Sequence, residues 1–568
     1  MARYDAEADY VVVGAGSSGC VLASRLSEDA ASSVILVEAG GRDDHPYLRM
    51  PLGFLRAVRD PRFGWNFMSE PEAHLGGRPL WIPRGKVLGG CSSINGMFYM
   101  RGHPLDYDGW AAVGCTGWGY EHVLPYFKRS ETSWRGEDRY HGSKGPLHVI
   151  PVNTNGLFHE EMMEAAKRCG YPITDDINGE VPEGFARGEV TIDSRGRRSS
   201  AARAYLHPSM KRPNLRVELN ALTTRVLFEG QTAVGIEYAR EGRITRVRAR
   251  REVLLSGGAY NSPQLLMLSG VGPAAHLNRH AIPVVADLPG VGRNLSEHAV
   301  SMVEFAATRA NTFLSKLRAD RAALSAARWA IFGGGAFSTL INSCNGIIRT
   351  EPGLDRPDVQ LMCNPVRLDA DVWYPGFSER KQHLFSVGIV ALHPHSRGHV
   401  ELHSADPTAA PRLVMNLAQE SHDVATIRRG IRAVRELYRT SPQAELTGAE
   451  LTPGEQIRSD AEIDAFVRSS VQLTQHPVGT CSMGTGPDAV LDAELKVRGV
   501  QGLRVIDASI MPTVPGGNTN AAAIMIGEKG ADLVLGRPAL SADVDAVWRV
   551  PADRHGTQAV VPPARQFA

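Results

Sequence analysis

The sequence predicts an α/β fold: one domain on a parallel sheet, joined to an α+β domain built on an antiparallel sheet. Three observations carry this prediction. The first 40 residues read as a strand–helix–strand unit, strand-like runs separated by charged or Gly-rich turns return between 215 and 256, and residues from about 305 to 465 have a different mixture of helix and strand patterns. A chain of 568 residues also favours two or more domains.

The N-terminal unit is the clearest local signal. Tyr10–Val13 is a short apolar, β-branched run, Cys20–Leu26 has helical spacing, and Val34–Glu38 reads as a second strand. A strand, a crossover helix and a second strand within 40 residues predict a parallel sheet. The segment that follows, from about 40 to 105, is rich in Gly, Pro and Arg and long for a structureless loop, so we expect it to be functional.

The turn between the first strand and the first helix carries the pattern Gly14-x-Gly16-x-x-Gly19. The first glycine makes the tight turn, the second admits a pyrophosphate close to the backbone, and the third lets helix and strand pack. Glu38 ends the second strand about 20 residues later, as expected of a carboxylate that accepts ribose hydroxyls. The unit is therefore Rossmann-like, and at this point FAD and NAD are both open.

The later helices and strands are predicted from the same kinds of apolar pattern. Runs expected to be antiparallel hairpins inserted into the α/β domain are Leu215–Leu219, Ala221–Phe228, Ala233–Tyr238 and Val253–Ser256. The second region is expected to contain helices Ala322–Phe332 and Ser421–Tyr438 and strands Leu384–Leu392 and Gly398–Leu402. A last strand, Leu503–Ile506, and a last helix, Ala521–Leu535, complete the α/β part, and residues 541–568 read as an extended or flexible tail.

Bulk properties exclude several functions. The net charge of +1 gives no reason to expect nucleic acid as a partner, and no run of about 18 apolar residues suggests a transmembrane helix. The start of the chain does not resemble a signal peptide. The seven cysteines are dispersed without a C-x-x-C pair, which favours reduced thiols in the cytoplasm and argues against a structural zinc site.

Five further segments stand out and, with the N-terminal unit, span residues 10 to about 535: Gly85–Met97 (GKVLGGCSSINGM), Gly258–Gly272 (GAYNSPQLLMLSGVG), Pro289–His298 (PGVGRNLSEH), His476–Gly484 (HPVGTCSMG) and Asp507–Pro512 (DASIMP). In sequence and in order they resemble motifs of the glucose–methanol–choline (GMC) oxidoreductase family. The chain most resembles members acting on primary alcohols, such as alcohol or choline dehydrogenases and aryl-alcohol or hydroxymethylfurfural oxidases. Two departures are Cys91, where Ser or Gly is usual, and Glu297, where Asp is usual.

The resemblance implies that the dinucleotide is FAD. It places Gly89–Met97 along the flavin and pyrophosphate, and the backbone of Val226 at the adenine. In some relatives a histidine at or near the position of Ile94 carries a covalent flavin bond; Ile94 has no nucleophilic atom, so non-covalent FAD is expected. Trp65 and Arg84 could equally be structural loop residues. The residues expected to bind FAD are Gly14, Gly16, Ser17, Ser18, Gly19, Glu38, Ala39, Trp65, Arg84, Gly89, Gly90, Ser92, Asn95, Gly96, Met97, Val226, Ala259, Asp507, Ala508, Thr519 and Asn520.

Alcohol oxidation needs a base for the hydroxyl proton while the flavin takes the hydride. His476 matches the family's catalytic histidine, and histidine suits the role because its usual pKa is about 6.5. Counting from Asp507 places the family's second His or Asn at Asn518, which can hydrogen-bond the developing alkoxide. Asn520 is the alternative, and we assign it with Thr519 to the pyrimidine edge of the flavin instead.

The resemblance also divides the chain. We expect an FAD-binding domain from 8–155, 215–305 and 466–540, and a substrate-binding domain from 156–214 and 306–465. The expected substrate is a small alcohol, with oxygen or a quinone or other carrier as electron acceptor and a monomer or homodimer as the assembly. A hydroxynitrile lyase that keeps a redox-silent flavin is the alternative enzyme, and a non-catalytic flavoprotein is disfavoured by His476 and Asn518.

Two other groups of residues carry less weight. The histidines between His393 and His403 could suggest a metal, but their SRGHVEL frame resembles a family hairpin, and we interpret it as a structural edge. Cys481 has no positioned base in its sequence and is interpreted as a packing residue. No G-x-S-x-G motif supports hydrolase chemistry.

Overall fold

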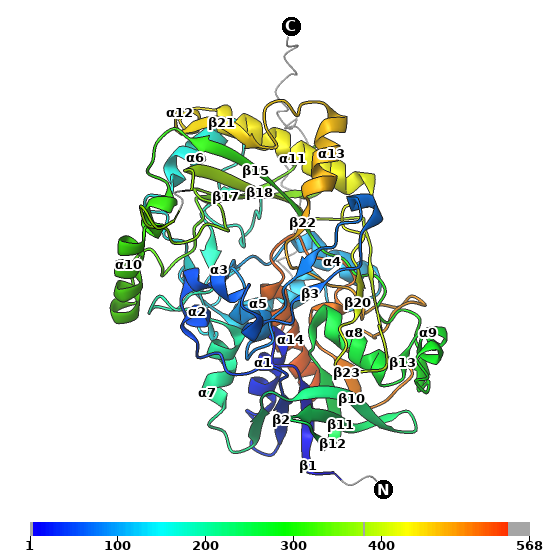
Figure 1. Cartoon of the computed structure of the whole chain (residues 1–568). Helices are drawn as coiled ribbons and strands as arrows, with labels where there is room; N and C mark the ends of the chain where they lie inside the picture. The colour runs from blue at the N-terminus through cyan, green and yellow to red at the C-terminus, as the bar shows by residue number, and fades with distance from the viewer. Residues whose placement is uncertain (1–3, 379–380, 544–568) are drawn as a thin grey trace.

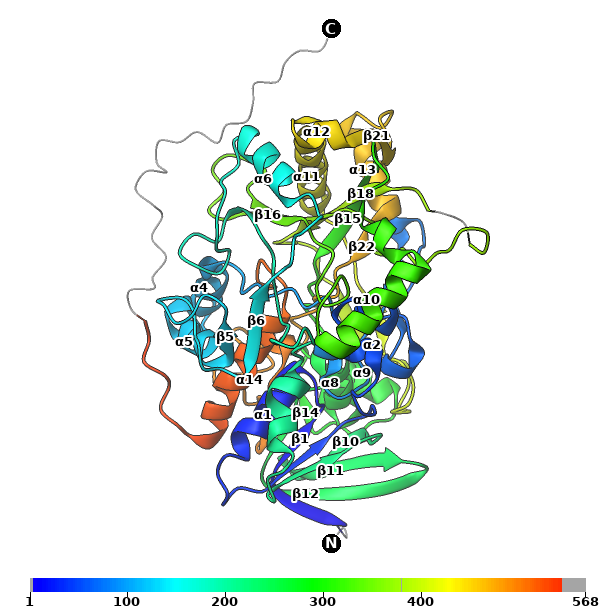
Figure 2. The same ribbon diagram turned by 90° about the vertical axis from the view of Figure 1, so that its left-hand side faces the viewer.

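The computed structural model describes residues 4–378 and 381–543. Two large sheets occupy opposite ends of the molecule, with helices α1 and α14 beside the first and α11 over the second (Figure 1). The view at right angles shows the same two layers (Figure 2). This arrangement confirms the predicted α/β class, with one largely parallel and one antiparallel sheet.

The first sheet has the strand order β10-β11-β12-β1-β2-β9, and β23 also pairs with β12. The strands β23, β12, β1, β2 and β9 are parallel to one another where they pair, while β10, β11 and the first part of β12 form antiparallel hairpins. Its strands are β1 (Ala6–Val13), β2 (Val34–Val37), β9 (Leu215–Glu218), β10 (Leu222–Glu229), β11 (Thr232–Arg240), β12 (Arg243–Leu255) and β23 (Leu503–Val505).

Two parts of the hairpin prediction are wrong: Leu215–Leu219, and Val253–Ser256, whose residues Val253–Leu255 pair parallel with both β1 and β23. Leu215–Leu219 was expected in an antiparallel hairpin, but β9 pairs parallel to β2, with Val34 opposite Leu215. The chain travels through residues 38–214 between these strands, so no tight turn forces it to return in the opposite direction. In β12, Arg243–Arg248 pair antiparallel with β11, whereas the strand pairs parallel with β1 from Val247 to Leu255.

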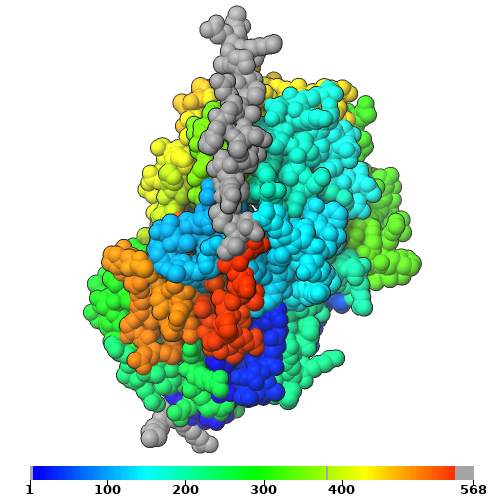
Figure 3. All heavy atoms as spheres, turned by 180° about the vertical axis from the view of Figure 1, so that it is seen from behind, coloured from blue at the N-terminus to red at the C-terminus, as the bar shows by residue number. Residues whose placement is uncertain are grey.

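The two ends of the described chain meet at this sheet. Helix α1 (Ser17–Leu26) lies against α14 (Asn520–Leu535), as the blue and red surfaces side by side in Figure 3 also show. Small residues permit the contact: a Cβ at Gly527 would lie 2.9 Å from Cβ of Val21. Because the helices are this close, both N-termini can reach one ligand.

The second sheet has the order β21-β15-β18-β17-β16-β7, with β22 pairing with β15, and every pairing is antiparallel. Helix α11 (Ser421–Arg439) covers its outer face, where a Cβ at Gly430 would meet Ile389 at 2.4 Å. The strands are β7 (Gly184–Ala186), β15 (Ala299–Ala307), β16 (Cys344–Ile348), β17 (Val359–Asn364), β18 (Leu384–Ala391), β21 (Thr447–Thr452) and β22 (Gln472–Leu473).

The remaining elements are short, apart from α10. The helices are α2 (Pro46–Arg49), α3 (Phe54–Ala57), α4 (Pro104–Ala112), α5 (Tyr120–Ser130), α6 (His159–Arg168), α7 (His207–Ser209), α8 (Gly258–Leu268), α9 (Ala274–Arg279), α10 (Ala319–Phe332), α12 (Gln443–Leu446) and α13 (Asp460–Ser470). The strands are β3 (Phe67–Met68), β4 (Trp81–Ile82), β5 (Glu131–Ser133), β6 (Leu147–Pro151), β8 (Glu189–Val190), β13 (Val271–Gly272), β14 (Ala286–Asp287), β19 (His399–Glu401) and β20 (Arg412–Val414).

The predicted division into domains stays a prediction, and several elements do not follow it, among them β22 (Gln472–Leu473), which belongs to the second sheet. Strand β15 begins at Ala299, before the boundary at 305, yet belongs to the second sheet. The helical turn Ala202–Leu206, placed in the substrate domain, packs against α1. The predicted tail falls mostly outside the described residues, which end at 543.

Candidate active site

A cavity of about 690 Å³ is lined by residues of both sheets and of the loops between them. Its first-sheet end is formed by the turn after β1, the end of β2 and the N-termini of α1 and α14. Its other end, the substrate chamber, is formed by His476, Asn518 and the inner face of the second sheet. Most of the residues predicted to bind FAD line this cavity: Gly14, Gly16, Ser17, Ser18, Glu38, Ala39, Trp65, Arg84, Gly90, Asn95, Gly96, Met97, Ala259, Asp507, Ala508, Thr519 and Asn520.

Three predicted residues support the site from behind the lining. A Cβ at Gly19 would lie 1.9 Å from the carbonyl oxygen of Gly14, so this glycine permits close packing of helix and strand. Gly89 adopts φ +86°, a left-handed conformation that favours glycine. The Ser92 hydroxyl donates to the Gly89 carbonyl at 2.6 Å and therefore holds the loop.

The assignment of Val226 to the adenine is not supported by its position. Its side chain does not line the cavity, and its backbone N–H donates to the hydroxyl of Ser269 at 2.8 Å. Ala221–Thr223 line the cavity instead, and the buried Thr223 hydroxyl has no protein partner. The segment that borders the cavity therefore lies three to five residues before Val226.

The dinucleotide end of the cavity is built from backbone donors and one buried acid. The carboxylate of Glu38 accepts the N–H groups of Ala15 and Gly40, each at 2.8 Å, and burial raises the pKa of this acid. The Ser17 hydroxyl donates to the side-chain oxygen of Asn520 at 2.8 Å, which joins the N-termini of α1 and α14. Two helix N-termini facing one cavity favour an anionic ligand such as a pyrophosphate. These residues fit FAD.

The Gly90→Ala variant tests whether this end of the cavity binds FAD. Gly90 has φ +52°, and a Cβ there would lie 2.8 Å from Cα of Gly16, where the two backbones must approach each other beside the ligand. We expect FAD affinity to fall by about tenfold or more, because one turn must shift. The flavin-to-protein absorbance ratio of the purified enzyme measures this. Gly76→Ala is the matched control, since Gly76 has φ +69° with open space around it; equal loss in both variants would show backbone strain alone.

A chain of hydrogen bonds fixes the orientation of His476. Nε2 of His298 lies 3.0 Å from the carbonyl oxygen of Leu392, to which it must donate. In a neutral ring, Nδ1 of His298 is then an acceptor, so Nδ1 of His476, 3.0 Å away, carries the proton. Nε2 of His476 is then unprotonated and accepts from the amide nitrogen of Asn518, 3.1 Å away. The two residues predicted to be catalytic are therefore in contact, and the basic nitrogen faces the cavity.

Electrostatics keep this base neutral. Burial, then His298 and Arg84, lower the pKa of His476 well below its usual value. Burial lowers the pKa of His298 to about 3. Both rings are thus uncharged near neutral pH, as the hydrogen-bond chain requires. A protonated His476 could not accept a second proton, so this depression keeps the base available over a wide pH range.

Glu297 lies behind the base. Its carboxyl accepts the backbone N–H of His476 at 2.6 Å, and its second oxygen is buried without a protein partner. Burial raises the pKa of Glu297 to about 8. This acid is therefore largely neutral near neutral pH and adds little negative charge to the site.

The raised pKa of Glu297 predicts how the stability of the Glu297→Gln variant depends on pH. A raised folded-state pKa means that wild-type stability declines as pH rises from the unfolded value of 4.5 through about 8, because the buried acid must ionise. Glutamine keeps the carbonyl acceptor and cannot ionise. We expect the variant's gain in Tm over wild type to be larger at about pH 9 than at about pH 6. Differential scanning calorimetry of both holoenzymes measures it, and a gain that is equal at both pH values would contradict the assignment.

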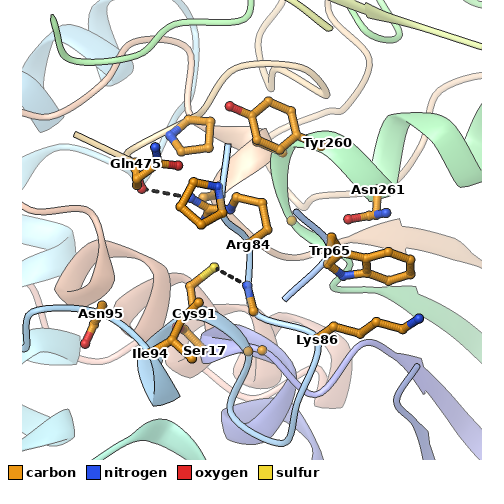
Figure 4. A pocket seen from close by; sticks show the side chains of 18 of the residues that line it. Ser17, Trp65, Arg84, Lys86, Cys91, Ile94, Asn95, Tyr260, Asn261 and Gln475 are labelled. Carbon is orange, nitrogen blue, oxygen red and sulfur yellow. Dashed lines mark hydrogen bonds between the residues drawn. The ribbon is translucent and has the colours of Figure 1, made fainter. Parts of the chain in front are cut away.

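Two residues of the site were not identified as functional from the sequence, whereas Arg84 was predicted to bind FAD. His298 and Glu297 stood in a recognised motif, but only the fold shows that they contact His476. Figure 4 shows Arg84 between Gln475 and Tyr260; its guanidinium donates to the Gln475 carbonyl at 2.9 Å. In the described chain no group of three His, Cys, Asp or Glu could hold a metal ion, and none of its helices is long and apolar enough to cross a membrane.

Fold and cavity together define an oxidoreductase that uses a dinucleotide cofactor. Two family models match the chain, the N-terminal part of the GMC oxidoreductases over residues 8–300 and their C-terminal part over residues 394–527. The chain therefore belongs to the GMC oxidoreductase family, as predicted. The predicted FAD cofactor and the class of oxidoreductase acting on CH–OH groups are confirmed with it.

Named relatives match this chain over nearly the whole length of both proteins. The oxygen-dependent choline dehydrogenase of Brucella ovis is 43% identical over 545 residues, which is 95% of this chain and 98% of the relative. Among solved structures, pyridoxine 4-oxidase from Mesorbium loti has a TM-score of 0.83 at 30% identity, covering 94% of this chain and all of that one. A formate oxidase variant from Aspergillus oryzae RIB40 has a TM-score of 0.87 at 25% identity, covering 94% and 99%.

Proposed function

We propose that this protein oxidises a primary alcohol to the aldehyde, with His476 as general base and Asn518 as the group that holds the oxygen. Bound FAD supplies the acceptor for the hydride that leaves the carbon. The alcohol loses two electrons and two hydrogens, one as that hydride and one as the hydroxyl proton, which passes to Nε2 of His476. The observation that carries the proposal is the hydrogen-bond chain that presents this unprotonated nitrogen to the cavity.

Asn518 has a defined part in this scheme. Without substrate its amide N–H donates to Nε2 of His476 at 3.1 Å. A hydroxyl placed between them donates its proton to the histidine and accepts from the amide. As the O–H bond breaks, negative charge grows on the oxygen, and the amide donor and the nearby Arg84 both stabilise it.

The electron acceptor, location and assembly remain part of the proposal. Oxygen is favoured by relatives whose names describe oxygen dependence or oxidases, and a quinone or other carrier is the alternative. The seven cysteines are all free, which supports a reducing, cytoplasmic location. Monomer and homodimer are both compatible with the chain.

Anaerobic mixing of the holoenzyme with a series of primary alcohols tests the proposal. We expect the visible absorption band of the flavin to bleach and the aldehyde to form in equal amount. Hydrogen peroxide formation on admitting oxygen, compared with reduction of a quinone, then identifies the acceptor. Absence of bleaching with every alcohol would overturn the proposal, and cyanohydrin cleavage with an oxidised flavin would favour the lyase.

A further inference from the structure

We infer that the substrate of this enzyme is an uncharged, apolar alcohol and that the site selects against quaternary ammonium alcohols such as choline. The inference rests on the proposed function and goes beyond it in naming the substrate class. It sets this chain apart from the choline dehydrogenases that it resembles at 43% identity. The evidence is the composition of the substrate chamber, taken row by row from the base outward.

The floor of the chamber is the inner face of the second sheet. Side chains alternate along a strand, so even-numbered positions of β15, β18 and β17 share one face. The odd-numbered Val303, Leu361 and Ile389 pack in the main core with α11, whereas the even-numbered positions form a separate cluster at the cavity. The strand pairing gives three rows: Val300–Val390–Gln360, then Met302–Gly388–Met362, then Glu304–Ser386–Asn364.

The first row is next to the base. Val300 follows His298 by two residues, and both Val300 and Val390 line the cavity with His476. In the second row Gly388 has no side chain, and the two methionines lie over the gap: a Cβ there would be 2.9 Å from Cε of Met362 and 3.5 Å from Sδ of Met302. Thioether side chains are apolar and adaptable, so this surface suits an alkyl or aryl group.

The charges of the cavity lie in the wrong places for a cationic substrate. Among the described residues the acids that line it are Glu38 and Asp507, and both hold backbone N–H groups at the dinucleotide end. Glu304 shares the sheet face with Val300 but lies about 13 Å further along the strand. It does not line the cavity, and it is paired with Arg367 at 3.4 Å. The charge that acts on the catalytic histidine is the positive one of Arg84.

Aromatic rings are the other means of holding a trimethylammonium group. The described lining contains the aromatic rings of Phe54, Trp65, Phe67, Phe98 and Tyr260. The tryptophan, whose face attracts a cation most strongly, and the tyrosine already carry cations of the chain itself. Nζ of Lys86 lies 4.5 Å from the ring of Trp65, and the guanidinium of Arg84 lies 5.9 Å from that of Tyr260. Figure 4 shows both cations beside these rings.

Among the described residues that line the chamber, a permanent cation meets neutral amides such as those of Gln360 and Asn364 but no carboxylate that could balance its charge. A quaternary ammonium group cannot shed a proton to become neutral, so its burial in this chamber without a counter-charge is unfavourable. An alkyl group of the same shape gains from burial against Val300, Val390 and the two methionines. The difference predicts discrimination by charge rather than by size.

Two pairs of alcohols, each matched in shape and differing in charge, test the inference. The first pair is choline and 3,3-dimethylbutan-1-ol, its uncharged isostere; the second, slimmer pair is 5-aminopentan-1-ol and hexan-1-ol. Anaerobic flavin reduction by the holoenzyme gives the rate divided by the dissociation constant for each. We expect the neutral member to be favoured by about tenfold or more in each pair whose neutral member reacts.

The outcomes separate the inference from the proposed function. A cation that reacts as well as its neutral partner, or better, overturns the substrate class while leaving alcohol oxidation intact. Failure of every alcohol, charged or neutral, overturns the proposed function. Reaction of hexan-1-ol alone supports the inference and shows a narrow chamber.

A charge-introducing variant gives an independent measurement. Met302→Glu places a carboxylate in the second row, and Met302→Gln is the control of similar size without charge. We expect the Glu variant to raise the choline-to-isostere ratio by about tenfold over the Gln variant, with flavin content equal in both. Equal ratios in the two variants would show that charge in this chamber does not govern selection, and would overturn the inference.

Discussion

Replacing His476 with alanine is expected to slow reduction of the bound flavin by alcohol by about 10²-fold or more. Nε2 of this ring is the unprotonated nitrogen that faces the cavity, and the described lining offers no other neutral imidazole. Without it, the hydroxyl proton must leave to water while the hydride departs. Anaerobic stopped-flow absorbance measures the rate, and the flavin-to-protein ratio shows that FAD is still held.

His476→Gln is the matched control for this loss. Glutamine is polar and of similar length, but its amide does not take up a proton at neutral pH. If His476 acts as a base, the Gln variant should be about as slow as the Ala variant, within roughly tenfold. A Gln variant close to wild type would mean that the residue only positions the alcohol, and undiminished reduction in the Ala variant would move the base elsewhere.

The parts of the fold that sequence could predict are those with local signals. The strand at Tyr10–Val13, the glycine turn and the helix after it form one contiguous unit, and the structure confirms it as β1 and α1. Helix α11 matches its predicted start at Ser421 because its apolar spacing is regular over 19 residues. The direction of a strand within a sheet has no such local signal. The parallel pairing of β9 with β2, for example, depends on a connection of more than 170 residues.

The residues of the candidate site could likewise be predicted from the sequence only where a local motif marks them. His476 and Asn518 were identified from motifs, and their contact agrees with the prediction that they act together. The place of His298, 178 residues before His476 in the chain, could be found only once β15 and the loop after β22 lay side by side. Val226 shows how uncertain a count along a strand is: it does not line the cavity, whereas Thr223, three residues earlier, does.

His298→Leu is expected to slow flavin reduction by about tenfold to 10²-fold, although His298 does not line the cavity. The ring of His298 accepts from Nδ1 of His476 and donates to the Leu392 carbonyl. Leucine offers neither group, so nothing holds the proton on Nδ1, and a share of His476 rings carries it on Nε2 and cannot act as base. His298 is in this sense a positioning residue.

Two readouts distinguish positioning from a merely structural role. His298→Gln offers an acceptor and a donor again and should recover most of the rate, within about tenfold of wild type. His298 is also one cause of the low pKa of His476, so its removal should move the acid limb of the reduction-rate profile to higher pH. Equal losses in the Leu and Gln variants with an unmoved profile would show that His298 serves packing alone, and wild-type rates in both would show that His476 needs no partner to keep its basic nitrogen toward the substrate.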